Sequence, residues 1–479
     1  MKQIIFFLMI LIVIAICGNT NVYASNANFY EGEYIDGIYI NKRANGSNTI
    51  YYQKARFFRQ SGTNDFAYCI EPFNFFNESS TYTSTLTPSN LSAYQKTRIS
   101  MIAHFGYGYK NHTDVKWYAI TQFMIWQAAD PSGDFYFTDS LNGTRITKYT
   151  SEMNEINNLI NNYQTTPSIA GKEYDLVEGE HLEVTDTNSV LNSYSSSDNN
   201  FKISNNKLVS EELKEGTYEI NLTRNSNIHN KPIIFYQASN SQNLVETGDI
   251  DSKTYKLKVN VIKTSLDITK IDSDTKTTTP SGDAKLEGSI FELYNSNMEK
   301  LKEIVIDKNS KAYLENLSFG KYYLKEIKPG IGYNINNEVY EFTISKENKD
   351  IKLTIENKVI ESKITINKNY EGSPNQKEPN VTFNIYNSKN KLVKTVTTNS
   401  SGIAEFILPY GKYKVKQLNS KDGYYKVEDF MIDVESNEKL KYFLTDYKIK
   451  VPNTRRDSII DRILRVIYLL CLKNCYLLL

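Results

Sequence analysis

The sequence predicts a mainly β, multidomain protein in which one α+β domain is followed by β-sandwich domains. Three observations lead to this prediction. The 479 residues are 40% hydrophobic and 13% aromatic, which is enough for several cores, and a chain of this length divides into about three or four domains. The best helical pattern, residues 114–129, lies in an aromatic-rich region near the N-terminus. Most of the later sequence consists of short alternating runs, which are typical of β-sandwiches.

The composition excludes several classes of function. The formal net charge is +1, whereas nucleic-acid binding needs a strong basic excess or patch, so we expect no nucleic-acid partner. Four cysteines and four histidines exclude a disulfide scaffold and leave little material for a zinc or iron–sulfur site. We expect no metal site and no cofactor, because the histidines are scattered along the chain: His104, His112, His181 and His229.

The N-terminus has the pattern of a secretory signal peptide, residues 1–24. Lys2 supplies the positive charge, residues 4–17 form the apolar run, and Val22 and Ala24 are the small residues of a cleavage site. A membrane anchor is the alternative, but the run is too short to span a bilayer comfortably. We therefore expect cleavage after Ala24 and export of the protein.

Residues 25–168 form the predicted α+β domain, and it contains Cys69, the one cysteine outside the two terminal segments. An unpaired cysteine in an exported protein indicates a reactive thiol or an intermolecular bridge, although a small buried hydrophobe is a common alternative. Ala119, Gln122 and Trp126 recur at helical spacing, which places Gln122 on an apolar stripe. Such a glutamine is usually a satisfied core amide. Paired with Cys69, it has another use: the thiolate attacks the amide, ammonia leaves and a thioester remains.

The remaining domains are predicted to be β-sandwiches. Residues 169–263 contain short alternating runs split by Asn, Ser and Gly. Residues 264–360 and 361–449 are two units of an internal repeat with a period of about ninety residues. The repeat is seen in segments that begin at Ser265 and Lys363, at Phe291 and Phe383, and at Gly320 and Gly411.

The first repeat unit places polar residues on apolar strand faces. Because strand side chains alternate between faces, Lys270 shares a face with Leu266 and Ile268. Glu326 and Asn357 likewise share faces with apolar residues of their own strands. Lysine and glutamate are almost never fully buried without a partner. An edge position is the alternative for one such residue, but three together favour an isopeptide bond in which the Lys270 amine attacks the Asn357 amide, Glu326 relays protons and ammonia leaves.

The second unit keeps this geometry and changes the chemistry. Lys368 and Asp446 take the places of the lysine and the asparagine, and Gln417 stands where the first unit has Glu326. An amide cannot relay a proton. The sequence therefore favours a buried Lys368–Asp446 ion pair with Gln417 as a hydrogen-bonding neighbour over a second covalent bond.

These motifs resemble known families. Tyr68-Cys69 and the helix segment Thr121 to Trp126 resemble the thioester domains of Gram-positive surface adhesins, with Met124 in place of the usual alanine. Residues 169–263 resemble the β domain that often follows them. The first-strand lysine, the Glu326-Ile-Lys-Pro-Gly turn and the last-strand asparagine resemble Cna-B-like, transthyretin-like isopeptide domains.

The C-terminus, residues 450–479, resembles a degenerate cell-wall sorting signal. Val451-Pro-Asn-Thr is followed by Arg455, where the family has glycine. Charged residues interrupt the apolar stretch that follows, and such charges oppose membrane retention. They are Asp461, Arg462, Arg465 and Lys473. Sortase is therefore an expected partner only if this signal works, and the protein is expected either at the cell surface and wall or secreted.

The ordered set of domains implies an adhesin that binds host targets covalently through a Cys69–Gln122 thioester, and not an enzyme. The expected partner is a host surface or matrix protein with a nucleophilic lysine. One alternative is a noncovalent binding or pilus-structural protein with an inert Cys69. A second is a cysteine hydrolase or transglutaminase-like enzyme that pairs Cys69 with His104 or His112.

Overall fold

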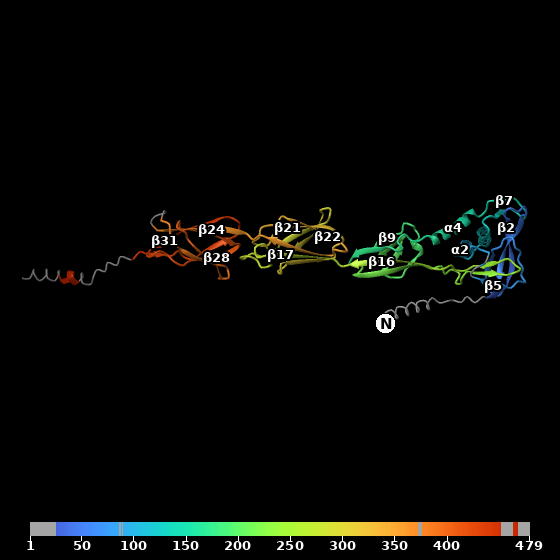
Figure 1. The fold of residues 1–479 in the computed structure, drawn as a ribbon, viewed down its shortest axis with the longest axis horizontal. Helices are drawn as coiled ribbons and strands as arrows, with labels where there is room; N and C mark the ends of the chain where they lie inside the picture. The colour runs from blue at the N-terminus through green and yellow to red at the C-terminus, as the bar shows by residue number, and fades with distance from the viewer. Residues whose placement is uncertain (1–24, 86–87, 89, 372–375, 452–462, 468–479) are drawn as a thin grey trace, which may run out of the picture. The chain divides into compact units, whose positions relative to one another are not determined.

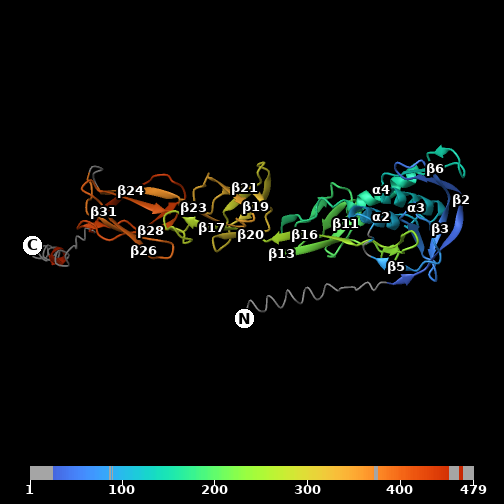
Figure 2. The ribbon, with the colours of Figure 1, turned by 45° about the vertical axis from the view of Figure 1, so that its right-hand side comes forward.

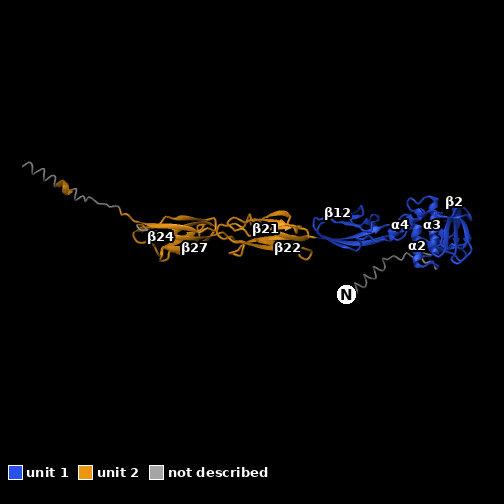
Figure 3. Ribbon diagram, turned by 90° about the horizontal axis from the view of Figure 1, so that it is seen from above, with its two compact units in different colours: residues 1–261 blue, residues 262–479 orange. Residues whose placement is uncertain are grey.

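The computed structural model describes residues 25–451 and 463–467, apart from positions 86–87, 89 and 372–375 (Figure 1). The predicted signal peptide, including Cys17, lies outside the described residues, as do most of the predicted sorting signal and its two cysteines. The chain divides into two compact units, residues 1–261 and 262–479 (Figure 3). Strands dominate both units, so the predicted mainly β fold class is confirmed.

The first unit contains an α+β domain built on a nine-stranded sheet, ordered β1-β5-β14-β15-β4-β3-β2-β6-β7. The helices α2, α3 and α4 pack against this sheet through one hydrophobic core (Figure 2). The strands are β1 (Asn26–Ala27), β2 (Phe29–Arg43), β3 (Tyr51–Gln60), β4 (Phe66–Cys69), β5 (Tyr82–Thr85), β6 (Asp134–Thr138), β7 (Arg145–Ile146), β14 (Ile234–Gln237) and β15 (Leu244–Glu246). The helices are α2 (Ala93–Phe105), α3 (Val115–Ala129) and α4 (Thr150–Gln164).

The helix α3 confirms the helical pattern read from the sequence. Asp114 caps its N-terminus by accepting a hydrogen bond from the Lys116 backbone N–H, as an N-cap aspartate is expected to do. The ten consecutive residues from Trp117 to Trp126 are all buried, because the helix lies between the sheet and its neighbouring helices. This burial fixes the side chain of Gln122 inside the domain.

The predicted boundary between the first two domains is wrong in one respect. The strands β14 and β15 fall within the predicted sandwich domain, residues 169–263, yet they insert between β5 and β4 of the first sheet. The chain thus leaves the first domain, builds the sandwich, returns to complete the nine-stranded sheet and leaves again along β16. Local alternation predicts that a segment is a strand, but it does not reveal the sheet that the strand joins.

The sandwich domain has its own core and two small sheets, ordered β10-β13-β16-β8 and β11-β12-β9. Its strands are β8 (Glu173–Val177), β9 (Glu183–Thr185), β10 (Ser195–Ser196), β11 (Phe201–Ser204), β12 (Lys207–Ser210), β13 (Gly216–Arg224) and β16 (Lys253–Ile262), with a short 3-10 helix at Leu191–Ser193.

The second unit contains two similar domains, each with two sheets around a core. In each domain the first strand pairs in parallel with the last long strand, β17 with β23 and β24 with β31. The first domain comprises β17 (Ser265–Asp272), β18 (Ile290–Tyr294), β19 (Lys300–Val305), β20 (Lys311–Glu315), β21 (Gly320–Lys328), β22 (Val339–Ile344) and β23 (Asp350–Asn357). The second comprises β24 (Glu361–Tyr370), β25 (Thr382–Tyr386), β26 (Leu392–Thr397), β27 (Ile403–Pro409), β28 (Gly411–Gln417), β29 (Tyr424–Tyr425), β30 (Phe430–Val434) and β31 (Leu440–Lys448).

Among the described residues, the structure has no helix with the length and apolar character needed to cross a membrane.

The inserted strands lead to a prediction about fragments. A fragment of residues 25–168 lacks β14 and β15 and so loses the link between β5 and the rest of the sheet, whereas residues 25–262 keep it. We expect the longer fragment to unfold cooperatively on heating and the shorter one to show no cooperative transition by circular dichroism. Equal melting temperatures for the two fragments would contradict this assignment of strands.

Candidate functional site

Cys69 and Gln122, which the sequence pairs, lie in direct contact. Cys69 ends β4 and is 1% exposed, and Gln122 projects from the middle of α3 and is 4% exposed. The Cys69 backbone N–H donates to Gln122 Oε1 at 2.8 Å, and Gln122 Nε2 donates to the Cys69 carbonyl at 2.8 Å. These two hydrogen bonds hold the plane of the side-chain amide beside the cysteine.

The thiol itself has two further partners that the sequence did not identify. It donates to the Glu71 carbonyl at 3.3 Å and to the side-chain oxygen of Gln242. Gln242 is buried in the loop between β14 and β15. A separation of 173 residues from Cys69 and the unforeseen insertion of these strands explain why local patterns gave no sign of it.

The surroundings of the thiol favour its uncharged form. Burial raises the pKa of Cys69 to about 11, and the nearby Lys42 side chain opposes the shift only in part. Lys42 is 8% exposed, its Nζ lies 4.4 Å from the centre of the Trp126 ring, and burial lowers its pKa. Burial thus disfavours the charged form of both groups. An acylated sulfur suits such a site because it carries no charge.

A cavity of about 450 Å³ opens beside the thiol. Lys42, Trp126 and Gln242 are among the residues that line it, so groups that surround Cys69 also face this space. Aromatic side chains supply much of the remaining wall: Tyr51, Tyr52, Phe58, Phe73, Phe75 and Phe76. The cavity is large enough to admit a long side chain.

In the second unit, the structure brings Lys270, Glu326 and Asn357 together as predicted. All three are at most 2% exposed. Lys270 Nζ donates to Asn357 Oδ1 and lies 3.1 Å from Glu326 Oε1, while Asn357 Nδ2 donates to Glu326 Oε2 at 2.8 Å. Burial lowers the pKa of Lys270, although Glu326 opposes the shift. The amine, the amide and the carboxyl thus form one closed cluster.

The corresponding cluster of the last domain contains the predicted residues and one more. Lys368 Nζ lies 2.6 Å from Asp446 Oδ1, and Gln417 Nε2 donates to Asp446 Oδ2 at 2.7 Å. Glu378, which the sequence analysis did not select, lies 2.8 Å from Lys368 Nζ and is 1% exposed. Its segment lies between two strands and follows no alternating pattern, so periodicity gave no signal for it.

Comparison with known proteins identifies the domains. Residues 66–165 match the family described as "Thioester domain", and residues 264–359 and 362–448 each match "SpaA: Prealbumin-like fold domain". The chain is a thioester-domain protein with tandem prealbumin-like domains. These matches agree with the thioester domain and the tandem transthyretin-like domains that the sequence predicted.

The individual relatives share little sequence identity with the chain or match only part of it. The "Trypsin-resistant surface T6 protein" of Streptococcus pyogenes serotype M6 is 33% identical over 89 residues, or 19% of this chain, and the chain spans only 15% of that relative's length. Among solved structures, the Bacillus anthracis TIE protein is 20% identical with a TM-score of 0.36, covering 88% of this chain and 84% of that chain. The thioester domain of the Staphylococcus aureus TIE protein is 19% identical with a TM-score of 0.39, covering 50% and 99% respectively.

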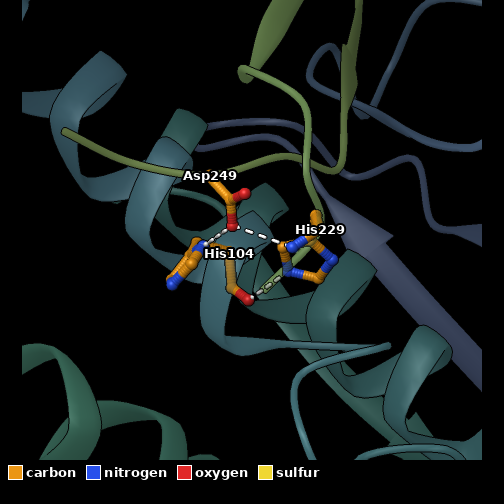
Figure 4. A group of neighbouring side chains, drawn as sticks. All are labelled: His104, His229 and Asp249. Atoms are coloured by element: carbon orange, nitrogen blue, oxygen red, sulfur yellow. Dashed lines mark hydrogen bonds and ion pairs between the residues drawn. The ribbon is translucent and has the colours of Figure 1, made fainter. Parts of the chain in front are cut away.

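Two of the four histidines, His104 and His229, lie close together in space although they are far apart in sequence, so scattered histidines are not a sound reason to expect no metal site. His104, His229 and Asp249 place their ligand-type atoms within 4.8 Å of one another (Figure 4). Each already has protein partners: His104 Nδ1 contacts the Gly248 carbonyl at 3.0 Å, and His229 Nε2 contacts the His104 carbonyl at 2.9 Å. Asp249 accepts three backbone N–H bonds. These contacts account for the positions of the three side chains.

The same contacts bear on the enzyme alternative. His112 stacks on Trp117 with ring centres 3.6 Å apart, and its Nδ1 contacts the Phe105 carbonyl at 2.8 Å. Within the described part of the chain, the hydrogen bonds of the Cys69 thiol go to Glu71 and Gln242 rather than to His104 or His112. The structure thus does not assemble the cysteine–histidine pair that this alternative requires.

The buried His104 predicts a pH dependence of stability. Burial lowers the pKa of His104 from 6.5 to about 4, so between these values the unfolded chain binds more protons than the folded domain. Stability is therefore present above pH 6.5 and falls as the pH drops toward 4, by about 3 kcal/mol from this group. The His104→Asn variant keeps an N–H donor near the Nδ1 position. Its free energy of unfolding should lack this part of the decrease with falling pH.

Urea unfolding of the wild type and of His104→Asn at several pH values measures this difference. Parallel stability profiles for the two proteins between pH 7 and pH 4 would contradict it.

Proposed function

We propose that the protein is a cell-surface adhesin that captures a host target covalently through a thioester between Cys69 and Gln122. The observation that supports this most directly is the pair of hydrogen bonds that holds the Gln122 amide against Cys69 beside an open cavity. The match of residues 66–165 to the thioester domain agrees with it. The chemistry uses each group once per molecule, so the protein acts as a binder and not as a turnover enzyme.

Thioester formation is balanced without an added reagent. The sulfur of Cys69 attacks the side-chain carbonyl carbon of Gln122, the carbon–nitrogen bond breaks, and the thiol proton leaves with the amide nitrogen as ammonia. Proximity makes this unfavourable exchange feasible, because the amide is already oriented in contact with the cysteine. Burial then protects the product, since Cys69 and Gln122 are 1% and 4% exposed and water has little access to the bond.

Capture reverses the exchange with a different amine. A lysine side chain of a host surface or matrix protein enters the cavity and attacks the Gln122 carbonyl carbon. The carbon–sulfur bond breaks, and the proton lost by the amine returns to the sulfur of Cys69. The product is an amide between the two proteins. A contact of this kind no longer dissociates at the rate set by noncovalent affinity.

The prealbumin-like domains form the stalk of the proposed adhesin. In the first, the neutral Lys270 amine attacks the Asn357 side-chain carbonyl, Glu326 carries the proton between the amine and the leaving group, and ammonia leaves. The resulting bond joins β17 to β23, the first and last strands of the domain. A pulling force that passes from one strand to the other is then borne by covalent bonds and does not unravel the residues between them.

The proposed location is outside the cell, at the wall or in the medium. The signal-peptide pattern of residues 1–24 supports export. The sorting motif that begins at Val451 is altered, so cell fractionation should test whether sortase attaches the protein to the wall. A noncovalent surface protein is the second candidate, and it differs in one property: it keeps Cys69 as a free thiol.

Intact-mass spectrometry tests the thioester. The exported chain should be lighter than its sequence mass by one ammonia for the thioester and by one more for the Lys270–Asn357 bond. Methylamine should add its own mass to the Gln122 side chain and leave the second deficit unchanged. Cys69→Ala and Gln122→Ala should each lack the methylamine-sensitive deficit, and adducts with purified plasma or matrix proteins should be absent for both variants on denaturing gels.

Gln127→Ala is the matched control, because Gln127 is exposed on the same helix. It should keep the deficit and the adducts. If the wild-type protein shows no mass deficit that methylamine removes, the thioester proposal is wrong.

A second prediction concerns the stability of the stalk. Glu326→Gln keeps the size of the side chain but removes the proton carrier, so the Lys270–Asn357 bond should not form. The crosslink closes a loop between residues 87 positions apart, and by the loop-entropy relation used for disulfides it is worth about 4.6 kcal/mol. The melting temperature of this domain should therefore fall by about 20 °C in calorimetry.

Glu341→Gln serves as the control for this measurement, since Glu341 is an exposed glutamate of the same domain that pairs with Lys321. If Glu326→Gln retains both the ammonia deficit and the wild-type melting temperature, the crosslink assignment is refuted.

A further inference from the structure

The last domain has a buried glutamate, but not at the position that Glu326 occupies in the preceding domain. In the first prealbumin-like domain, Glu326 pairs in register with Phe291. In the second, Gln417 pairs with Phe383 in the same way. The strand register therefore confirms that Gln417 occupies the position of Glu326. A covalent bond in this domain would need an acid from another position.

A second buried carboxyl group lies in contact with the lysine. Glu378 Oε2 lies 2.8 Å from Lys368 Nζ, and Asp446 Oδ1 lies 2.6 Å from the same atom. The side chains of these three residues are at most 2% exposed. The Glu378 backbone is fixed by hydrogen bonds with the Lys368 carbonyl and the Thr398 hydroxyl. The backbone of Glu378 therefore fixes its side chain in contact with Lys368 Nζ.

The position of Glu378 can be aligned with a residue of the first prealbumin-like domain. Gly288 and Asn380, each three residues before the aligned phenylalanine, both have a positive φ, at 81° and 62°. The backbones therefore align here without a gap, and two residues earlier the first domain has Leu286 where the second has Glu378. The first domain thus combines an apolar residue with Glu326, and the second combines a glutamate with Gln417. The acid has changed position between the domains.

We propose that the last domain forms an isopeptide bond between Lys368 and Asp446, with Glu378 as its catalytic acid and base. Lys368 Nζ contacts both carboxyl groups, so a proton can pass between the amine and either carboxyl group. The reactive form, a neutral amine with two protonated carboxyl groups, places no net charge in the buried site.

The reaction is balanced as follows. The neutral Lys368 nitrogen attacks the carboxyl carbon of Asp446, and the carbon–nitrogen bond forms. Glu378 takes one proton from this nitrogen and gives one to the departing hydroxyl group, so the carbon–oxygen bond breaks and water leaves. Gln417 Nε2, which donates to Asp446 Oδ2 at 2.7 Å, stabilises the negative charge that develops on that oxygen. The roles that Glu326 combines in the first domain are divided here between Glu378 and Gln417.

This inference does not depend on the thioester, and its readout is separate. The mass lost is that of water instead of ammonia, methylamine does not restore it, and fragmentation of proteolytic peptides should identify a branched peptide that joins Lys368 to Asp446. We expect this peptide in the wild-type full chain. In Glu378→Gln the rate of its formation should fall about 100-fold or more, as for loss of a general acid–base group.

The double variant Glu378→Gln/Gln417→Glu separates catalysis from folding. It places a glutamate at the position that corresponds to Glu326 of the neighbouring domain and should regain the crosslink. Glu405→Gln, at an exposed glutamate on β27 that pairs with Lys363, is the matched control and should crosslink like the wild type. The Lys270–Asn357 peptide reports on the integrity of each preparation.

Three results would overturn the proposal. They are the absence of the Lys368–Asp446 peptide from the wild type, its undiminished formation in Glu378→Gln, and a double variant that remains unlinked. The first of these would leave an ion pair as the final state of the cluster.

Discussion

The contact between the Gln122 amide and the Cys69 backbone is the interaction on which the proposed function depends. Two hydrogen bonds of 2.8 Å join the middle of a buried helix to the end of a central strand. They require α3 to lie against β4. The strand β15 pairs with β4, and the loop between β14 and β15 supplies Gln242 as a further partner of the Cys69 thiol. The architecture of the first unit thus serves to hold one amide beside one thiol in a dry place.

The same physical device recurs in the second unit. Lys270 and Lys368 are each buried completely among one or more carboxyl or amide groups. Clusters of this kind are costly when left as ions, because desolvation offsets much of the attraction between the charges. A covalent bond removes that cost by converting charged groups into a neutral amide. Parallel pairing of the first and last strands supplies the geometry, since it sets the acceptor residue beside the lysine in both domains.

The sequence was informative wherever the evidence is local or repeated. The period of two along the strands placed Lys270, Glu326 and Asn357 on inward faces, and the internal repeat extended the same reasoning to Lys368 and Asp446. Helical spacing placed Gln122 on a buried face. Sequence reasoning did not find residues that depend on long-range topology: Gln242 comes from strands that return to the first sheet, and Glu378 comes from an irregular segment. His104 and His229 belong to the same class, because 125 residues separate them along the chain.

Peptide mapping of Cys69 after denaturation and alkylation tests the central claim most directly. If Cys69 is joined to Gln122, the denatured wild-type chain should show no alkylated Cys69 until methylamine has opened the bond, after which alkylation should be complete. Gln122→Ala should be alkylated at once. Complete alkylation of Cys69 in the untreated wild-type protein would show a free thiol and would contradict the account.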